Sequence, residues 1–420
     1  MTNDQQYYES LIVQGHPPEH ALHYTRTYFP NFYPRHQLNT PPQQVYYQIP
    51  VVQQQKNNRT LFIVLGVGIF ALAVVAMLIL AVFSVALFES QDSTPEFGFR
   101  HDVNPIMFEQ LGDNQEPYDT PDYPNFSSVV YIEGIATDGE VYSGSGVVIA
   151  ERWVLTAAHV MEGMKVSDTF VFIGNDYESF DFRISIKSYS IHPGWPLATK
   201  YSADEQDEIL EEGTDIALIE LEESVDSSTV DIAMWYNSNS SSQNNELLDS
   251  KIYISGFGDY SEDNSMCSEH CLTDSSGYFS KRRAWENTLD RIVEDIQSTV
   301  EYENQLEWKG GWVVYDFDGP WKNHNSLASG ETYNFEQGDY SYAGQGDSDP
   351  KPLALEGTSV AGDSGGPTFA LIDGNWTVIG LTSHGSAAAN YGDVAFNTAV
   401  FSHYAWICSH HQLGNEIPGC

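Results

Sequence analysis

The chain has 420 residues and a formal net charge of −41 at neutral pH, because 59 acidic side chains face only 18 basic ones. A charge of this sign and size repels nucleic-acid phosphates, so it argues against a nucleic-acid-binding protein. Hydrophobic residues make up 41% of the chain, and the length leaves room for two core-forming units plus appendages.

Residues 1–60 are rich in Tyr, Gln, Pro and His. Residues 5–14 and 18–28 could form two short helices, and the Pro/Gln composition of residues 39–55 predicts a disordered linker. The two helices are a candidate docking element for a cytoplasmic partner. A tail without a partner is an equally good interpretation, and the sequence does not choose between them.

Residues 61–88 form an apolar run without a charged side chain. The run is longer than the roughly 20 residues that a helix needs to cross a bilayer, and it starts too far along the chain for a usual secretory signal. Lys56 and Arg59 precede the run and Glu89 follows it. The positive-inside rule therefore predicts a single-pass anchor with a cytoplasmic N-terminus and an extracellular C-terminal part. Cleavage after Ala86, which would release that part, is the alternative.

Residues 89–121 are acidic and contain prolines without a clear period, so we expect a stalk. From about residue 122 the pattern changes to short β-rich runs separated by Gly, Asp and Asn. Many short strands with turn signals between them predict an all-β barrel or sandwich. The runs are residues 129–132, 146–149, 153–155, 169–173, 216–221, 251–255 and 376–382.

Three short motifs in this β-rich part carry groups suited to acyl transfer. Ser364 lies in the sequence GDSGGP, where Gly362 lets the backbone approach a bound carbonyl. The amides of Gly362 and Ser364 could then face the oxygen that becomes negative in the transition state. A serine hydroxyl is a weak nucleophile until a base removes its proton. His159, at the end of LTAAH, supplies a base, and Asp215, at the head of an apolar strand, supplies a carboxylate.

In the chain order His, Asp, Ser, these motifs resemble the trypsin/chymotrypsin family of serine proteases over residues 122–410. Trp153 before the histidine and the SHG sequence at 383–385 add to the resemblance. The resemblance implies an all-β fold of two six-stranded antiparallel barrels, about 122–235 and 236–410, with the active site between them. It also implies a closing C-terminal helix near Phe401–Ile407, which leaves residues 411–420 as a tail.

The resemblance implies a serine endopeptidase that acts on proteins or peptides. Ser364 would attack the carbonyl, His159 would accept and return the proton, and Asp215 would orient the imidazole. Gly362 and Ser364 would form the oxyanion hole. No cofactor is implied, and no Cys or His pairs recur at zinc-ligand spacing. Two alternatives are a non-catalytic surface binding module on the same fold and an esterase, whose usual residue order is Ser, acid, His.

The family places Thr358 at the base of the primary specificity pocket. Trypsin-like members carry an aspartate there to pair with Arg or Lys, so this sequence disfavours basic specificity. We expect a neutral pocket for medium-sized apolar or polar side chains. The combination of His384 with Thr358 leaves open a preference for acidic side chains, as in glutamyl endopeptidases. The other expected pocket residues are Ser359, Ser383 and Gly385.

The sequence departs from the family pattern near the active site. The usual cysteine after the catalytic histidine is Val160, and the usual cysteine that precedes the serine is Val360, so disulfides that brace the site in many relatives are missing. Classical members are also cut to expose an Ile/Val-led terminus, which pairs with the aspartate before the serine. Asp363 is present, but no such stretch precedes the first barrel, and Arg100 is the lone basic residue of the stalk. We therefore expect maturation without that cleavage, with Asp363 held by another group.

The distance in sequence from Asp215 to Ser364 is longer than the family usually shows. We place the excess in an insertion at about 262–355, with a helix near 285–300. The insertion would shape substrate access or be a peripheral decoration. The sequences at 283–287 and 315–318 resemble bacterial members of the family.

All four cysteines follow the predicted membrane span, in an oxidising location where disulfides form. Proximity in sequence favours the pairs Cys267–Cys271 and Cys408–Cys420, although four cysteines allow three pairings. No metal site is predicted. The acidic run 204–215 and the pair Asp316 and Asp318 are read as solvated acidic surface, with calcium binding as the lesser alternative.

Overall fold

The computed structural model describes most of the chain after residue 97. The described residues are 98–100, 102–195, 213–238, 240–258, 281–297, 309–319, 325–328, 343, 347–385, 389–412 and 415–420. The predicted tail 1–60, membrane span 61–88 and Cys267–Cys271 pair lie outside them. Among the residues that are described, no helix has the length and apolar character needed to cross a membrane.

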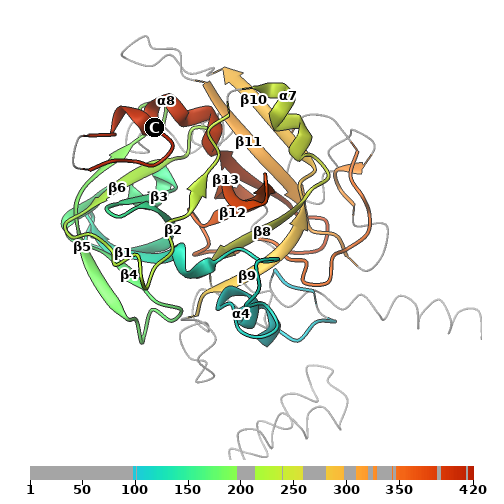
Figure 1. The fold of residues 1–420 in the computed structure, drawn as a ribbon, viewed down its shortest axis with the longest axis horizontal. Helices are drawn as coiled ribbons and strands as arrows, with labels where there is room; N and C mark the ends of the chain where they lie inside the picture. Colours follow the sequence, from blue (N-terminus) through green and yellow to red (C-terminus); the bar gives the residue numbers. More distant parts are fainter. Residues whose placement is uncertain are drawn as a thin grey trace, which may run out of the picture. The chain divides into compact units, whose positions relative to one another are not determined.

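The first half of the described chain forms a closed antiparallel barrel in the strand order β1-β2-β3-β6-β5-β4 (Figure 1). Its core is a cluster of buried aliphatic side chains that includes Val130, Val148 and Ile219. The prediction of a six-stranded first barrel is confirmed. The strands are β1 (Val129–Ala136), β2 (Val141–Ala150), β3 (Trp153–Thr156), β4 (Met164–Ile173), β5 (Phe182–Ile191) and β6 (Ala217–Leu221).

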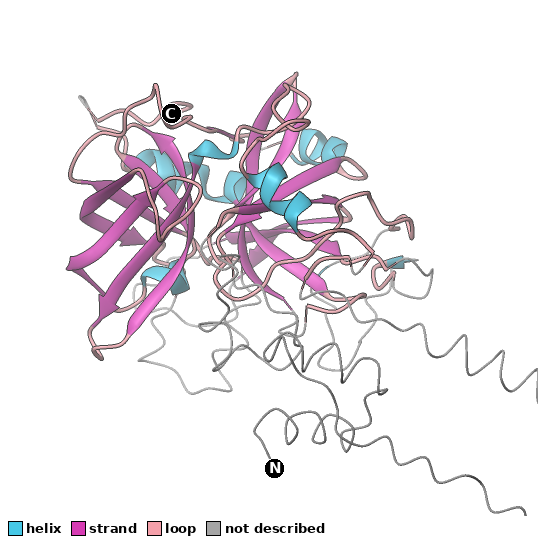
Figure 2. Cartoon of the chain, turned by 90° about the horizontal axis from the view of Figure 1, so that it is seen from below, coloured by secondary structure: helices cyan, strands magenta, loops and turns pink. Residues whose placement is uncertain are grey.

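The second group of strands, seen beside the first in Figure 2, is a sheet of eight strands in the order β10-β11-β14-β13-β12-β8-β9, with β7 paired to β13. The prediction of six strands in this half is therefore wrong in number. Two features account for the extra strands. β9 and β10 stand at opposite ends of the order but are separated in the chain only by Leu289 and Asp290, and the two-residue β7 adds to β13. The strands are β7 (Met234–Trp235), β8 (Lys251–Gly256), β9 (Arg283–Thr288), β10 (Arg291–Gln297), β11 (Lys309–Asp316), β12 (Pro367–Ile372), β13 (Asn375–Gly385) and β14 (Val394–Ala399).

The helix predicted near residues 285–300 is wrong, because β9 and β10 occupy this stretch. Several polar side chains of this stretch are buried and paired inside the sheet. Glu286, for example, accepts hydrogen bonds from the Lys251 ammonium (2.9 Å) and the Tyr253 hydroxyl (3.1 Å). The strands β9, β10 and β11 thus belong to the second sheet, and the expected insertion does not include them.

The segment preceding the first barrel also differs from the prediction. Residues 98–100 and 102–113, here called the lead segment, pack against the second sheet instead of forming a stalk. Phe108 and Leu111 of helix α4 (Ile106–Gly112) are fully buried, and Phe99 stacks on Phe108 with ring centroids 4.1 Å apart. The sequence shows no periodic pattern of apolar residues here, because α4 has only seven residues.

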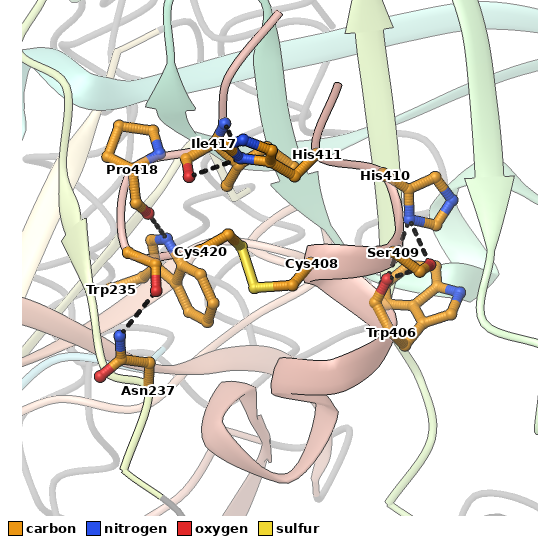
Figure 3. The surroundings of a disulfide bond; sticks show 11 residues. Trp235, Asn237, Trp406, Cys408, Ser409, His410, His411, Ile417, Pro418 and Cys420 are labelled. Carbon is orange, nitrogen blue, oxygen red and sulfur yellow. Dashed lines mark hydrogen bonds between the residues drawn. A yellow bond between two sulfur atoms is a disulfide. The ribbon is translucent and has the colours of Figure 1, made fainter. Parts of the chain in front are cut away.

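The 3₁₀ turn η7 (Val400–His403) and helix α8 (Tyr404–Ser409) follow β14, as the resemblance implied. The predicted disulfide Cys408–Cys420 is confirmed, with Cα atoms 5.3 Å apart. Figure 3 shows the bond beside Trp235, whose indole N–H donates to the Pro418 carbonyl at 2.7 Å. The last residues are therefore fastened to the domain by one covalent and several polar contacts. Four further short helical elements are described: η1 (Phe126–Ser128), α5 (Ala158–Met161), α7 (Ser241–Asn244) and η3 (Asn245–Leu247).

A group of buried carboxyls lies at and beyond the end of β11, so the prediction that Asp316 and Asp318 belong to a solvated acidic surface is wrong. Asp318 is 6% exposed and one of its oxygens has no hydrogen-bond partner, while its backbone N–H donates to Glu356 at 2.9 Å. Burial, with the charges of Asp316 and Glu356, raises the pKa of Asp318 to about 9, and burial raises the pKa of Glu356 to about 8. Within the described ranges, no three His, Cys, Asp or Glu side chains are arranged to hold a metal ion.

These carboxyls predict a pH-dependent stability. Asp318 is protonated in the folded protein near neutral pH and ionised in the unfolded chain, so folding takes up a proton and stability falls as pH rises from about 4 to about 9. Asp318→Asn cannot ionise, and its stability advantage over wild type should grow by up to about 1.4 kcal/mol per pH unit in that window. Urea unfolding at pH 5 and pH 8 measures it. The exposed Asp119→Asn serves as control, and an equal difference at both pH values would contradict the assignment.

Candidate active site

His159 and Asp215 meet at one end of the first barrel. His159 lies on the short helix α5 (Ala158–Met161), which follows β3, and Asp215 precedes β6. In the antiparallel pair of β3 and β6, Thr156 lies opposite Ala217. His159, after β3, and Asp215, before β6, therefore lie at the same end of the barrel. The imidazole Nδ1 and the Asp215 Oδ2 are 2.7 Å apart, and the His159 backbone N–H donates to Oδ1 at 2.9 Å.

Residues of the second sheet fix Asp215 further. The Ser383 hydroxyl on β13 donates to the Asp215 Oδ2 at 2.6 Å, and the Thr398 hydroxyl on β14 donates to the Asp215 carbonyl at 2.9 Å. Asp215 is completely buried. Burial acts to raise the pKa of Asp215, but the His159 charge and these hydrogen bonds outweigh it and lower the pKa. The carboxylate therefore stays ionised at neutral pH.

The His159 side chain is 33% exposed, so part of it remains open to solvent. Burial acts to lower the pKa of His159, but the charge of Asp215 and its hydrogen bond outweigh burial and raise the pKa. Because a general base must be neutral, activity that depends on His159 should fall on the acid side of this raised pKa.

Ser364 lies in the loop before β12, and Ser145 of β2 holds this loop against the first barrel. The Ser145 backbone N–H donates to the Ser364 carbonyl at 2.8 Å, and the Ser145 hydroxyl donates to the Gly362 carbonyl at 2.9 Å. The same hydroxyl accepts from the Phe257 N–H at 2.9 Å. The sequence analysis missed Ser145; its only signal was a serine between two glycines in a strand otherwise rich in valine.

Gly365 brings the serine loop close to the histidine. Its φ is +80°, and a Cβ there would lie 2.1 Å from the Thr156 hydroxyl and 2.7 Å from the Ala157 nitrogen. Only glycine allows this approach. Val160 and the Ser364 carbonyl also both lie within about 3 Å of the Cβ position of Gly144. The Ser364 backbone is thus next to the residues that flank His159.

No hydrogen bond joins the Ser364 hydroxyl to His159 in the described structure. Catalytic hydrogen bonds are often long in free enzymes and tighten when substrate binds. The structure therefore brings His159 and Asp215 into direct contact and Ser364 into their neighbourhood.

The backbone of the serine loop leaves two amides available. The amides of Asp363, Gly365 and Gly366 donate to the carbonyls of Val360, Thr382 and Asp363, respectively. In the described part of the chain, the amides of Gly362 and Ser364 donate to no protein acceptor. These are the two amides that the sequence analysis assigned to the oxyanion hole.

The carboxylate of Asp363 is held by the backbone. Its Oδ1 accepts from the Gly258 N–H at 2.7 Å and its Oδ2 accepts from the Val360 N–H at 2.9 Å. Such bonds can orient a buried carboxylate in the serine loop without a charged chain terminus.

The expected pocket residues have different surroundings. Thr358 is buried at 3% exposure, and Ser359 and Gly385 lie nearer the surface. Ser383 directs its hydroxyl to Asp215, so that hydroxyl is not available to a substrate. His384 stacks flat on Phe396 with ring centroids 4.8 Å apart, and burial lowers the pKa of His384 to about 4.

Comparison with known proteins identifies a relationship over part of the chain. The family model described as Trypsin matches residues 125–295, less than half of the chain, and this range contains His159 and Asp215. The chain is also 36% identical over 59 residues to Spermosin of Halocynthia roretzi, and the aligned part spans 14% of this chain and 14% of Spermosin. Together with the closed barrel and second sheet, the match to the family model shows that this part of the chain is similar to the trypsin/chymotrypsin-like serine proteases.

Proposed function

We propose that this protein is a serine endopeptidase that uses His159, Asp215 and Ser364. The main support is the pair of hydrogen bonds from His159 to the buried Asp215, together with the packing of Gly365 against Thr156 and Ala157. A carboxylate that orients a half-exposed imidazole beside a glycine-flanked serine is the arrangement that acyl transfer requires.

In this mechanism the neutral His159 accepts the Ser364 proton as the hydroxyl oxygen attacks the peptide carbonyl. Asp215 bonds to Nδ1, so Nε2 is the nitrogen that takes up the proton, and the carboxylate stabilises the imidazolium. The amides of Gly362 and Ser364 stabilise the negative oxygen of the tetrahedral intermediate. His159 then protonates the leaving amine. A water molecule next attacks the carbonyl of the acyl-enzyme while His159 accepts its proton, and His159 returns a proton to Ser364 as the acid product leaves.

For the primary pocket we propose a preference for medium-sized uncharged side chains. Thr358 offers no negative charge to an Arg or Lys side chain. His384 is neutral at physiological pH because burial lowers its pKa to about 4. It therefore carries no positive charge that could pair with an acidic side chain of a substrate, although it could form a hydrogen bond. Cleavage of a random peptide library measures the preference, and strong cleavage after Arg or Lys would refute it.

The catalytic proposal is tested by labelling with a fluorophosphonate probe, which reacts with an activated serine. Wild type should be labelled and should cleave peptides, whereas Ser364→Ala should do neither. Ser167→Ala is the control, since this exposed serine of β4 is not among the proposed site residues and should retain labelling. An unlabelled, inactive but folded wild type would favour the non-catalytic binding module instead.

We further propose that residues 61–88 anchor the protein with the N-terminus in the cytoplasm and the protease domain outside. The support is the uncharged apolar run with Lys56 and Arg59 before it. Sodium carbonate should leave the full chain in the membrane fraction, and protease added to intact cells should remove the C-terminal part. Release by carbonate would overturn the anchor.

We also propose that, within the family, the chain resembles bacterial members in particular. The support is the sequence at 283–287.

A further inference from the structure

The lead segment contacts both loops that flank the proposed specificity pocket. The Gly98 carbonyl accepts from the Thr358 N–H at 2.8 Å, and the Gly98 N–H donates to the Ala389 carbonyl at 3.2 Å. Thr358 lies before the serine loop, whereas Ala389 lies beyond the end of β13. A single residue thus joins two loops that are 31 positions apart.

The contact is tight enough to require glycine on both sides. Gly98 has φ +85°, and a Cβ there would lie 2.8 Å from the Thr358 carbonyl and 2.9 Å from a methyl of Val360. Phe99 forms an antiparallel bridge with Gly357, where a Cβ would lie 2.8 Å from the Gly98 carbonyl. The backbone of the lead segment therefore lies directly on the pocket loop.

Buried side chains fix the lead segment itself. Phe99 is 3% exposed and packs between Phe108 and the edge of Trp285, with ring centroids 4.1 and 6.2 Å away. The Trp285 indole donates to the Tyr315 hydroxyl at 3.4 Å. Arg100 adds a hydrogen bond to the Leu353 carbonyl at 2.5 Å. These contacts hold Phe99 and Arg100 in place beside the loop at 357–360.

We infer that Gly98 and Phe99 are positioning residues that hold the two pocket loops together. This inference rests on the proposed function for its consequence in catalysis. The position that carries a bracing cysteine in many family members is Val360 here, and Val360 contacts Gly98. Two backbone hydrogen bonds from Gly98 thus join the pocket loops without a covalent link at Val360. A trypsin-type cut after Arg100 would detach this brace, so it would weaken substrate binding instead of activating the enzyme.

The test compares two glycine variants of the full chain. Gly98→Ala and Gly374→Ala both force a side chain into left-handed backbone, with φ of +85° and +81°, but no atom lies within 4 Å of a Cβ at Gly374. Gly98→Ala should raise KM by roughly tenfold and broaden the preference for the side chain in the pocket, whereas Gly374→Ala should leave both unchanged. Fluorophosphonate labelling of Ser364 should proceed at the wild-type rate in both, because the small probe does not fill the pocket.

A second measurement does not depend on catalysis. Hydrogen exchange at the Thr358 amide should speed up in Gly98→Ala and stay slow in Gly374→Ala, even if the protein proves not to be a protease. Equal exchange at Thr358 in both variants, or an unchanged KM in Gly98→Ala, overturns the brace. If Gly98→Ala does not fold, Phe99→Ala takes its place, with Phe126→Ala as control, because Phe126 is fully buried against Phe369 away from the pocket loops.

Discussion

Asp215→Asn should lower kcat by about 10⁴-fold while leaving KM within a factor of a few. The amide can still fill the space, but it cannot stabilise an imidazolium. The imidazole Nδ1 (2.7 Å) and the Ser383 hydroxyl (2.6 Å) both donate to Oδ2, so an NH₂ group at that position would face two donors. The imidazole would then be held in the tautomer that carries its proton on Nε2, which cannot accept the serine proton.

The pH profile separates this role from a structural one. The charge of Asp215 raises the pKa of His159. In Asp215→Asn the acid limb of the residual kcat/KM should therefore move to lower pH than in wild type. Ser383→Ala is the matched control, because it removes one hydrogen bond to the carboxylate but keeps the charge, and it should cost far less activity. An Asp215→Asn enzyme with wild-type kcat would exclude Asp215 from the mechanism.

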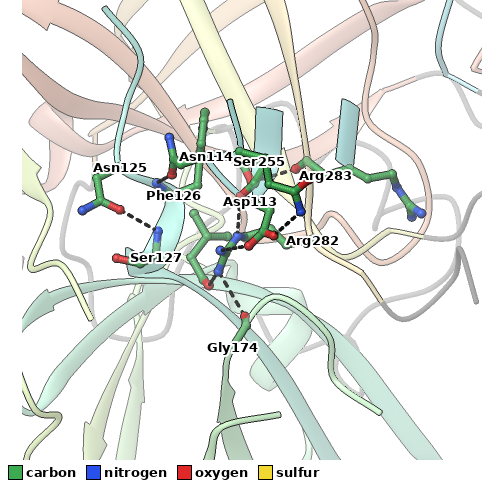
Figure 4. Close-up of polar contacts among 12 residues, drawn as sticks. Asp113, Asn114, Asn125, Phe126, Ser127, Gly174, Ser255, Arg282 and Arg283 are labelled. Carbon is green, nitrogen blue, oxygen red and sulfur yellow. Dashed lines mark hydrogen bonds and ion pairs between the residues drawn. The ribbon is translucent and has the colours of Figure 1, made fainter. Parts of the chain in front are cut away.

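Arg282→Met should lower the free energy of unfolding by about 3–5 kcal/mol. Arg282 is 5% exposed and donates to the carbonyls of Gly112 (2.8 Å), Val129 (3.1 Å) and Gly174 (3.0 Å). Figure 4 shows the contact with Gly174. These carbonyls belong to the lead segment, to β1 and to the chain after β4. Burial lowers the pKa of Arg282 to about 10, so the guanidinium remains charged at neutral pH. Methionine fills a similar volume but leaves these carbonyls without donors.

Arg152→Met is the matched control for this prediction. Arg152 also makes three side-chain hydrogen bonds to carbonyls, two to Leu221 and one to Glu222, but it lies near the surface, where water can replace the guanidinium. Its loss should cost less than about 1 kcal/mol. Urea unfolding measures the loss in free energy of unfolding for both variants. Equal losses would mean that the buried Arg282 stabilises the fold no more than Arg152 does.

Local motifs were sufficient to predict part of the strands and the positions of His159 and Asp215 at strand ends. The alternating apolar runs at 129–132 and 169–173 lie in β1 and β4, and the LTAAH and TDIAL sequences lie where β3 and β6 end and begin. These predictions succeeded because strand propensity and turn chemistry are encoded within a few residues. The pair of Cys408 and Cys420 was similarly accessible, since only eleven residues separate them.

Only the tertiary structure showed what lies between the motifs. The sequence determined which residue types could perform acyl transfer and in which order they occur, and it placed His159 and Asp215 at strand ends. The tertiary structure decided that Ser145 holds the serine loop, that residues 285–297 are strands, and that Gly98 lies on the pocket loop. Each of these depends on contacts between residues far apart in the chain; Ser145 and Gly362, for example, are 217 positions apart. Burial and long-range pairing override local propensity at such points, so no short window of sequence contains them.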